Sequence, residues 1–235
     1  MTVYDLLILQ IIAHLLADFT FQSKEWVIGK RKDGFSSWAL FYHALVVLVI
    51  SFLLSDQFSF MWFSVIIAFS HWVIDGVKNS VKDYKFAFFI DQFLHLVIIA
   101  AMVFTYNHYF LLKPIIDLSF NTHHLLIIAG YLVCTKPANI LIRKILDLFN
   151  STLVNEETTE LLNAGKLIGT LERFLILSLL LFSQFTAVGF LITAKSILRY
   201  EGVKTSKTEY VLIGTLLSFS IAFLMYMIIN QIKFY

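Results

Sequence analysis

The feature that most constrains the fold of this chain is a series of long apolar runs. Each run contains close to 20 residues, about the length at which an α-helix crosses the roughly 30 Å hydrocarbon core of a bilayer. The sequence is 59% hydrophobic and 14% charged, with a mean hydropathy of +0.80, which is too apolar for a water-soluble globular domain. It predicts an all-α protein, a polytopic bundle of transmembrane helices.

The apolar runs predict about seven transmembrane segments. These cover residues 3–22, 37–55, 58–77, 86–106, 121–142, 169–194 and 209–231. We expect a single integral membrane domain over residues 1–235. Its parts are a four-helix bundle (1–106), a fifth span with an amphipathic extension (107–149), a cytoplasmic loop (150–168) and two last spans (169–235). The alternative is six spans plus a re-entrant segment that turns near Gly189.

Lysine and arginine residues are distributed unevenly between the two sides of such a bundle. Thirteen fall on one side and five on the other. Because positive loops favour the cytoplasm, the N-terminus is predicted outside and the C-terminus inside. Four of the five outside charges cluster between Lys195 and Lys207, and the re-entrant alternative would move them inside. The first run lacks a basic leader and predicts a retained helix rather than a signal peptide.

Histidine and aspartate recur inside the first four predicted spans, where a charged group costs about 2.5 to 3.5 kcal/mol at a helix centre. Three spans carry a His and an Asp four residues apart, a spacing that places both side chains on one helix face. The residues are His14 and Asp18, His71 and Asp75, Asp91 and His95, together with His43. All seven fall in the part of their span nearest the cytoplasm, so four neighbouring helices can bring them together.

Four imidazoles and three carboxylates form a mixed nitrogen and oxygen ligand set. Such a set suits Zn, Mn or Fe better than Ca or Mg, and we expect one or two divalent ions, with Zn preferred. Ions of this kind activate water and stabilise phosphoryl displacement, so the pattern predicts a metal-dependent hydrolase. Two alternatives apply to single residues: Asp18 or Asp75 orients an imidazole instead of binding metal, or a lone buried His serves helix packing.

Three more polar residues are candidates for supporting roles. Lys78, one turn beyond Asp75, is either a phosphate-binding cation or an anchor at the membrane interface. Glu172 and Arg173 lie at the predicted start of the sixth span. Either Glu172 transfers a proton and Arg173 binds a phosphate, or the two residues only stabilise the start of a helix.

Other polar residues are predicted to lie at the external end, away from the site. Under the seven-span topology these are Lys195, Arg199, Glu209, Tyr210, His108, His123 and His124.

The net charge and the cysteine content exclude some classes of partner and of metal site. A net charge of +2 without a basic run predicts no nucleic-acid partner, and the lone Cys134 gives neither an internal disulfide nor a cysteine metal motif. The predicted partners are the lipid bilayer and a lipid-like substrate, such as a phosphorylated lipid or another amphiphile. A soluble partner or a homo-oligomer is left open, as are two other functions: a metal-ion or proton-coupled transporter and a structural or regulatory membrane subunit.

Several motifs together resemble a known family. They are His14-Leu-Leu-Ala-Asp18-Phe with Gln22, His43, His71-x-x-Ile-Asp75 with Lys78, Asp91-Gln-x-x-His95, and the C-terminal stretches beginning at Gly165, Ala194 and Glu209. In these motifs the chain resembles bacterial membrane proteins catalogued as domain of unknown function 3307. The resemblance implies a bacterial cytoplasmic membrane and no particular activity. The His and His-x-x-x-Asp elements more loosely resemble predicted membrane-bound metal-dependent hydrolases.

Overall fold

The computed structural model describes residues 1–80, 85–116, 121–149, 159–200 and 206–231. These residues form helices joined by short turns and contain no strand, which confirms the all-α prediction for the described part of the chain. The chain divides into two compact units, Met1–Leu125 and Leu126–Tyr235.

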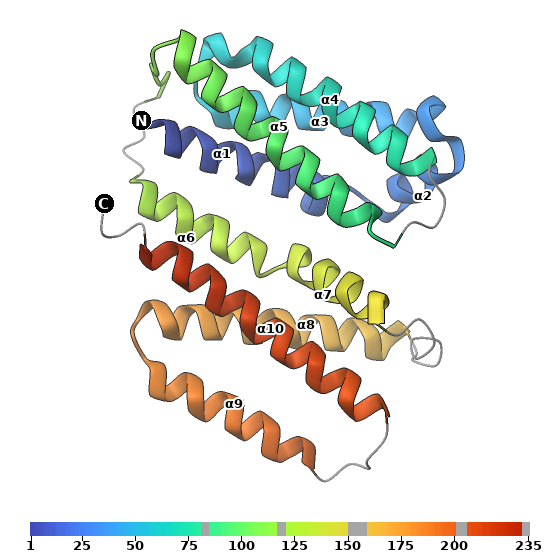
Figure 1. Ribbon diagram of the computed structural model, residues 1–235, viewed down its shortest axis with the longest axis vertical. Coiled ribbons are helices and arrows are strands. Elements are labelled where there is room, and N and C mark those ends of the chain that lie inside the picture. The colour runs from blue at the N-terminus through green and yellow to red at the C-terminus, as the bar shows by residue number, and fades with distance from the viewer. Residues whose placement is uncertain (81–84, 117–120, 150–158, 201–205, 232–235) are drawn as a thin grey trace. The chain divides into compact units, whose positions relative to one another are not determined.

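The first unit is a bundle of four long helices with a short helix at one end (Figure 1). The helices are α1 (Val3–Leu15), α2 (Lys24–Asp33), α3 (Trp38–Ser55), α4 (Met61–Ser80) and α5 (Ala87–Tyr109). α1 continues into a π-helical turn, Leu16–Phe21, and 3-10 turns at Gly34–Ser36 and Phe58–Phe60 precede α3 and α4. The short helix α2 packs against α3 and α4.

Capping residues explain where the first two helices begin. The Thr2 hydroxyl accepts a hydrogen bond from the Asp5 amide (3.2 Å), and the Thr2 amide donates to the Asp5 carboxylate (2.6 Å), a reciprocal capping box that starts α1. The Ser23 hydroxyl accepts from the Trp26 amide and starts α2. The basic segment at 23–36, expected as a connection, is therefore largely helical.

The long helices of the first unit are apolar on both their inner and outer surfaces. Inside, Leu6, Val47, Ile67 and Val103 pack into one core. Outside, large apolar side chains remain exposed, including Trp62, Phe69 and Phe93. Val3–Phe21, Trp38–Ser55, Phe58–Asn79 and Ala87–Tyr109 are each long and apolar enough to cross a membrane. The helices predicted for the first four spans are confirmed to within a few residues.

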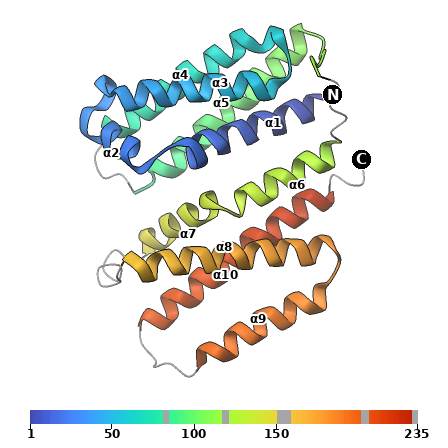
Figure 2. The ribbon, with the colours of Figure 1, turned by 180° about the vertical axis from the view of Figure 1, so that it is seen from behind.

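The second unit contains α7 (Lys136–Phe149), α8 (Thr159–Leu181), α9 (Phe185–Tyr200), α10 (Ser206–Gln231) and most of α6 (Thr122–Val133). α10 is antiparallel to α6 and α7 (Figure 2). A Cβ at Gly130 of α6 would lie 3.0 Å from Ile229 near the end of α10, and one at Gly214 near its beginning would lie 3.7 Å from Leu146 of α7. Leu212–Gln231 is long and apolar enough to span a membrane.

The fifth predicted span, 121–142, is not one continuous helix. The helix is interrupted at Cys134 and Thr135, and α6 and α7 are inclined at 51° to each other. Pro137 lies in the first turn of α7, where its missing N–H is tolerated, whereas it would interrupt a continuous helix. The segment predicted as an amphipathic extension of the fifth span forms the separate helix α7. Among the described residues, five helices can span a membrane, or six if α6 and α7 count as one span.

The prediction of a single span over 169–194 is wrong. α8 ends at Leu181, the chain turns through Phe182–Gln184 with Ser183 in the left-handed region (φ 59°), and α9 runs back along α8 (Figure 1). The reversal that the re-entrant alternative placed at Gly189 lies at Ser183. Residues 159–168, expected in a cytoplasmic loop, form the first turns of α8.

These corrections move two candidate residues. Glu172 and Arg173 lie in the middle of α8 rather than at the start of a span. The ammonium group of Lys195 on α9 forms an ion pair with Glu172, so these residues do not lie at opposite faces as the seven-span topology required. The side chains of Arg199, Lys204, Lys207, Glu209 and Tyr210 lie outside the described residues.

The α8–α9 reversal can be tested by crosslinking. With Cys134→Ala as background, we expect a short bifunctional maleimide to join Glu172→Cys to Lys195→Cys within one chain, detected by mass spectrometry after proteolysis. Glu172→Cys and Ser183→Cys should stay unlinked, because about 15 Å of helix separates them. Absence of a link between positions 172 and 195 would restore the single span, whose ends lie about 30 Å apart.

Candidate metal centre

Seven histidine and aspartate side chains meet inside the first unit. They are His14 and Asp18 from α1 and its π-helical turn, His43 from α3, His71 and Asp75 from α4, and Asp91 and His95 from α5. Their nitrogen and oxygen atoms form three overlapping groups, within each of which one atom per residue lies within 4.8 Å of the others. The groups are His14, Asp18 and His71; His43, His71 and Asp75; and Asp75, Asp91 and His95. The structure therefore brings together every residue predicted for the metal site.

Asp18 is the hub of this cluster. Its Oδ1 atom lies 3.2 Å from His71 Nε2, 3.3 Å from His43 Nε2 and 3.8 Å from His14 Nδ1, three imidazoles that come from three helices. Asp18 belongs to the π-helical turn at Leu16–Phe21, and π-helical turns are frequent at functional sites. Its side chain is only 10% exposed. A single carboxylate oxygen thus faces imidazole nitrogens from several directions.

The imidazole rings of His43 and His71 lie side by side, with their planes tilted by 56° and their centres 4.9 Å apart. Their Nε2 atoms are 2.9 Å apart, and Asp75 Oδ2 lies 3.8 Å from the first and 3.9 Å from the second. His95 adds a third ring, whose centre is 3.9 Å from that of His71. Three imidazoles and one carboxylate so close together form a compact donor set without a cysteine.

Many polar atoms of the cluster are buried without a hydrogen-bond partner. They are His14 Nδ1, Asp18 Oδ1, His43 Nδ1, Asp91 Oδ1 and both ring nitrogens of His95, against one further such atom, His123 Nδ1, elsewhere in the described residues. The imidazole nitrogens near Asp18 Oδ1 do not have hydrogen-bond geometry toward it. A buried group of this kind costs about 1 to 3 kcal/mol when unpaired, so such groups rarely gather by chance. Electron-pair donors gathered in groups whose atoms lie within 4.8 Å of one another fit a bound cation.

Gln92 holds three members of the cluster in place, and sequence reasoning did not single it out. Its Nε2 donates to Asp18 Oδ2 (3.3 Å) and Asp91 Oδ2 (3.1 Å), and its Oε1 lies 3.2 Å from His14 Nε2. An amide oxygen only accepts, so His14 donates from Nε2 and its Nδ1 keeps a lone pair for a ligand. Gln92 follows Asp91 directly on α5, and this adjacency to a predicted ligand is the signal that could have identified it.

Two lysines contact the carboxylates. Lys30 of α2 is buried, and its ammonium group is paired with Asp75 Oδ2. Lys78 of α4 lies 2.6 Å from Asp91 Oδ2 and 3.9 Å from Asp75 Oδ1, with 32% of its side chain exposed. Lys78 was a predicted neighbour of the site, whereas Lys30 was not, because it stands in a run of basic residues with Arg31 and Lys32 that is typical of an exposed loop.

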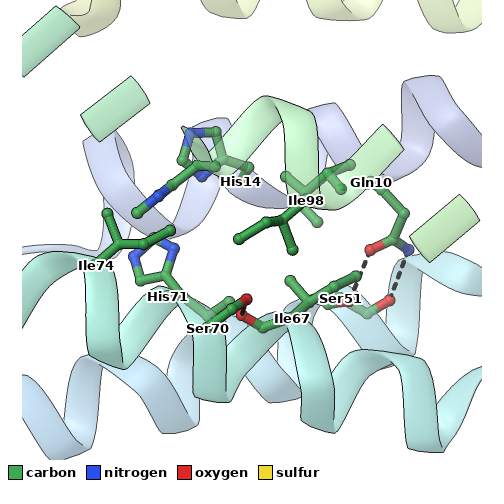
Figure 3. A pocket seen from close by; sticks show the side chains of 12 residues that line it. Gln10, His14, Ser51, Ile67, Ser70, His71, Ile74 and Ile98 are labelled. Atoms are coloured by element: carbon green, nitrogen blue, oxygen red, sulfur yellow. Dashed lines mark hydrogen bonds between the residues drawn. The ribbon is translucent and has the colours of Figure 1, made fainter. Parts of the chain in front are cut away.

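A narrow cavity extends from the imidazoles into the bundle (Figure 3). His14 and His71 line one end, and Gln10 and Ser51 line the other, where the Ser51 hydroxyl donates to Gln10 Oε1 (2.6 Å). Its volume is about 10 Å³, close to the room that one water molecule needs. Polar side chains therefore continue along the interior beyond the seven clustered residues.

Residues 6–127 match the protein family described as "Protein of unknown function (DUF3307)". The chain belongs to this family. The DUF3307 match includes all seven clustered residues together with Lys30, Lys78 and Gln92, so the complete site lies inside the family's domain. The C-terminal stretches that resemble the family lie outside the matched residues. No curated protein and no solved structure matches the chain, and the looser similarity to metal-dependent hydrolases therefore gains no support from known proteins.

Arg173 and Glu172 lie beyond the DUF3307 match and have partners of their own. Arg173 is 1% exposed and donates to the Cys134 carbonyl (2.9 Å), to Ser218 (3.0 Å) and to Asn139 (2.7 Å). It therefore caps the end of α6 and ties the α6–α7 break to α8 and α10, and Glu172 is paired with Lys195. These contacts give both residues partners within the second unit, and the supporting roles predicted for them stay predictions. Among the described residues, His108, His123 and His124 belong to no group that could hold a metal ion.

The role of Gln92 can be tested by removing its amide. We expect Gln92→Leu to weaken zinc binding by about 10- to 100-fold, because residues that orient ligands have effects of this size. Competition with a fluorescent zinc chelator would measure the affinity. Gln184→Leu, at an exposed glutamine in the turn between α8 and α9, is the matched control and should bind zinc normally. Equal affinities for the two variants would show that Gln92 does not orient the donors.

Proposed function

We propose that this protein is a membrane-embedded hydrolase that uses one or two divalent metal ions. The observation that carries the proposal is the convergence of buried, unpaired imidazole and carboxylate atoms from four helices. Ionisable groups within membrane helices are costly, and they generally serve a function. The mixed nitrogen and oxygen donors favour Zn, with Mn and Fe as alternatives.

Two ions can be accommodated without sharing a residue. The groups His14–Asp18–His71 and Asp75–Asp91–His95 have no member in common, and His43 lies next to His71 between them. Divalent ions there would activate a water molecule and stabilise the negative charge that develops during displacement at phosphorus. Gln92 would orient His14 and two carboxylates, and the surrounding apolar core would exclude bulk water. This arrangement requires no serine or cysteine nucleophile.

The surroundings of the site support an amphiphilic substrate. α2, which carries Lys30 into the cluster, also exposes apolar Val27 and Ile28 and basic Lys24 and Arg31 on its surface. Such a helix suits the interface between lipid headgroups and acyl chains. We therefore place this end of the bundle at the cytoplasmic face of the bacterial cytoplasmic membrane, where positive residues are favoured.

The orientation predicted for the C-terminus changes. α10 is antiparallel to α6 and α7, so the end of α10 packs against α6 while its beginning packs against α7. The loop that leads into α6 follows α5, which runs outward if the N-terminus is outside. We accordingly propose that both termini lie outside, in place of the N-out and C-in arrangement expected from seven spans.

Metal content and hydrolysis test the proposal together. Purified protein should contain one or two zinc ions by mass spectrometry, and His71→Ala and His95→Ala should each lose most of the metal. They should also lose hydrolysis of a phosphate ester presented in mixed micelles. His124→Ala, at an exposed histidine outside the cluster, should keep both. If every preparation is stable but contains no metal, the result would favour the function of a structural or regulatory membrane subunit.

A transporter is the second candidate, and one observation favours it. Buried polar side chains continue from the cluster through Gln10, Ser51 and Ser64, of which Ser51 lies 3.1 Å from Ser64. A transporter needs such groups beyond the site, whereas an enzyme does not. Zinc-driven quenching of a dye enclosed in proteoliposomes, abolished by Gln10→Leu while metal content stays normal, would identify transport. Hydrolysis without zinc entry would identify the enzyme.

A further inference from the structure

The two lysines of the site are arranged around its carboxylates. Lys30 reaches Asp75 from α2, and Lys78 reaches Asp91 and Asp75 from α4, so both ammonium groups lie at the edge of the third donor group. Each lysine thus contacts a carboxylate that could bind a metal ion. A metal ion bound by Asp75 and Asp91 would neutralise part of the negative charge of these carboxylates. The positive charges of the two ammonium groups would then be less well balanced.

The charge of the site depends on its metal content. Three carboxylates against two ammonium groups leave a net charge of −1 when the imidazoles are neutral, as metal binding requires. One divalent ion changes the net charge to +1, and two ions change it to +3. Because uncompensated buried charge is costly, a metal-loaded site in this apolar bundle attracts an anion.

We propose that Lys30 and Lys78 bind the phosphoryl group of an anionic substrate beside the metal donors; the inference rests on the metal-dependent function proposed above. A phosphate monoester carries a charge between about −1.5 and −2 and presents three oxygens, enough to contact both ions and lysines. Lysine suits this task because it acts as a point charge on a flexible stem. The partial exposure of Lys78 gives the group a way to turn from Asp91 toward an incoming ligand.

Phosphate binding by the full chain tests the inference without an activity assay. In equilibrium dialysis with radiolabelled orthophosphate, zinc-loaded protein should bind phosphate and chelator-treated protein should not. Lys30→Met and Lys78→Met should each weaken binding about ten-fold or more, as expected for loss of a charge-assisted hydrogen bond. Lys32→Met, at an exposed lysine of α2, should bind like the unmodified protein. Zinc content measured in the same samples separates loss of phosphate from loss of metal.

Lys78→Met keeps the test decisive if Lys30→Met fails to fold, because Lys78 is partly exposed. Normal phosphate affinity in zinc-loaded Lys78→Met, or equal binding with and without zinc, would overturn the inference while leaving the hydrolase proposal standing. Absence of zinc from the unmodified protein would instead overturn the hydrolase proposal.

Competition distinguishes the two sources of a phosphoryl group. Displacement of labelled phosphate by glycerol phosphate and by short-chain phosphatidic acid at equal concentrations would indicate a soluble monoester. Displacement by the lipid at much lower concentration would indicate a phosphorylated headgroup, and either result supports the inference. Equal displacement by acetate would contradict it, because acetate lacks the second charge and the third oxygen.

Discussion

The first unit depends on one constraint: polar groups taken into an apolar interior must find partners inside the protein. Asp18, His43 and His71 come from three different helices and meet within about hydrogen-bonding distance. Each helix therefore has a fixed rotation and depth relative to the other two, since a rotation would turn these groups out of the interior and a shift of one turn would move them about 5.4 Å apart. The apolar core fills the remaining interior, but it constrains the register of the helices less tightly, because most apolar surfaces can pack on one another.

The second unit solves a similar problem with different residues. Arg173 is held by the Cys134 carbonyl, Asn139 and Ser218, partners from three neighbouring segments. The broken helix between α6 and α7 exposes carbonyl groups that a continuous helix would satisfy, and the guanidinium supplies a donor for one of them. A break in an apolar helix and a buried arginine are therefore two parts of one arrangement.

The four-helix bundle and six of the seven clustered residues could be predicted from sequence because they depend on two robust patterns, span length and the i, i+4 spacing; His43 followed from its similar depth in its span. The α8–α9 turn could not, since Ser183 and Gln184 are only a short polar interruption of a long apolar run and the turn contains neither glycine nor proline. The same run made Arg173 look like the start of a helix, although α8 begins at Thr159. Lys30 was missed for a different reason: it is buried, but it stands next to the exposed Arg31 and Lys32 in a run that is typical of a surface loop.

The position of Lys30 on α2 has a thermodynamic consequence. A surface helix and a buried carboxylate are joined through one ammonium group, so any species that takes Asp75 away from Lys30 also loosens the attachment of α2. By reciprocity, whatever stabilises a displaced α2, including the composition of the surrounding headgroups, raises the affinity of the interior for that species by the same factor. In the membrane placement proposed above, the bundle's interior and the lipid surface at α2 are in this way two linked ends of a single equilibrium.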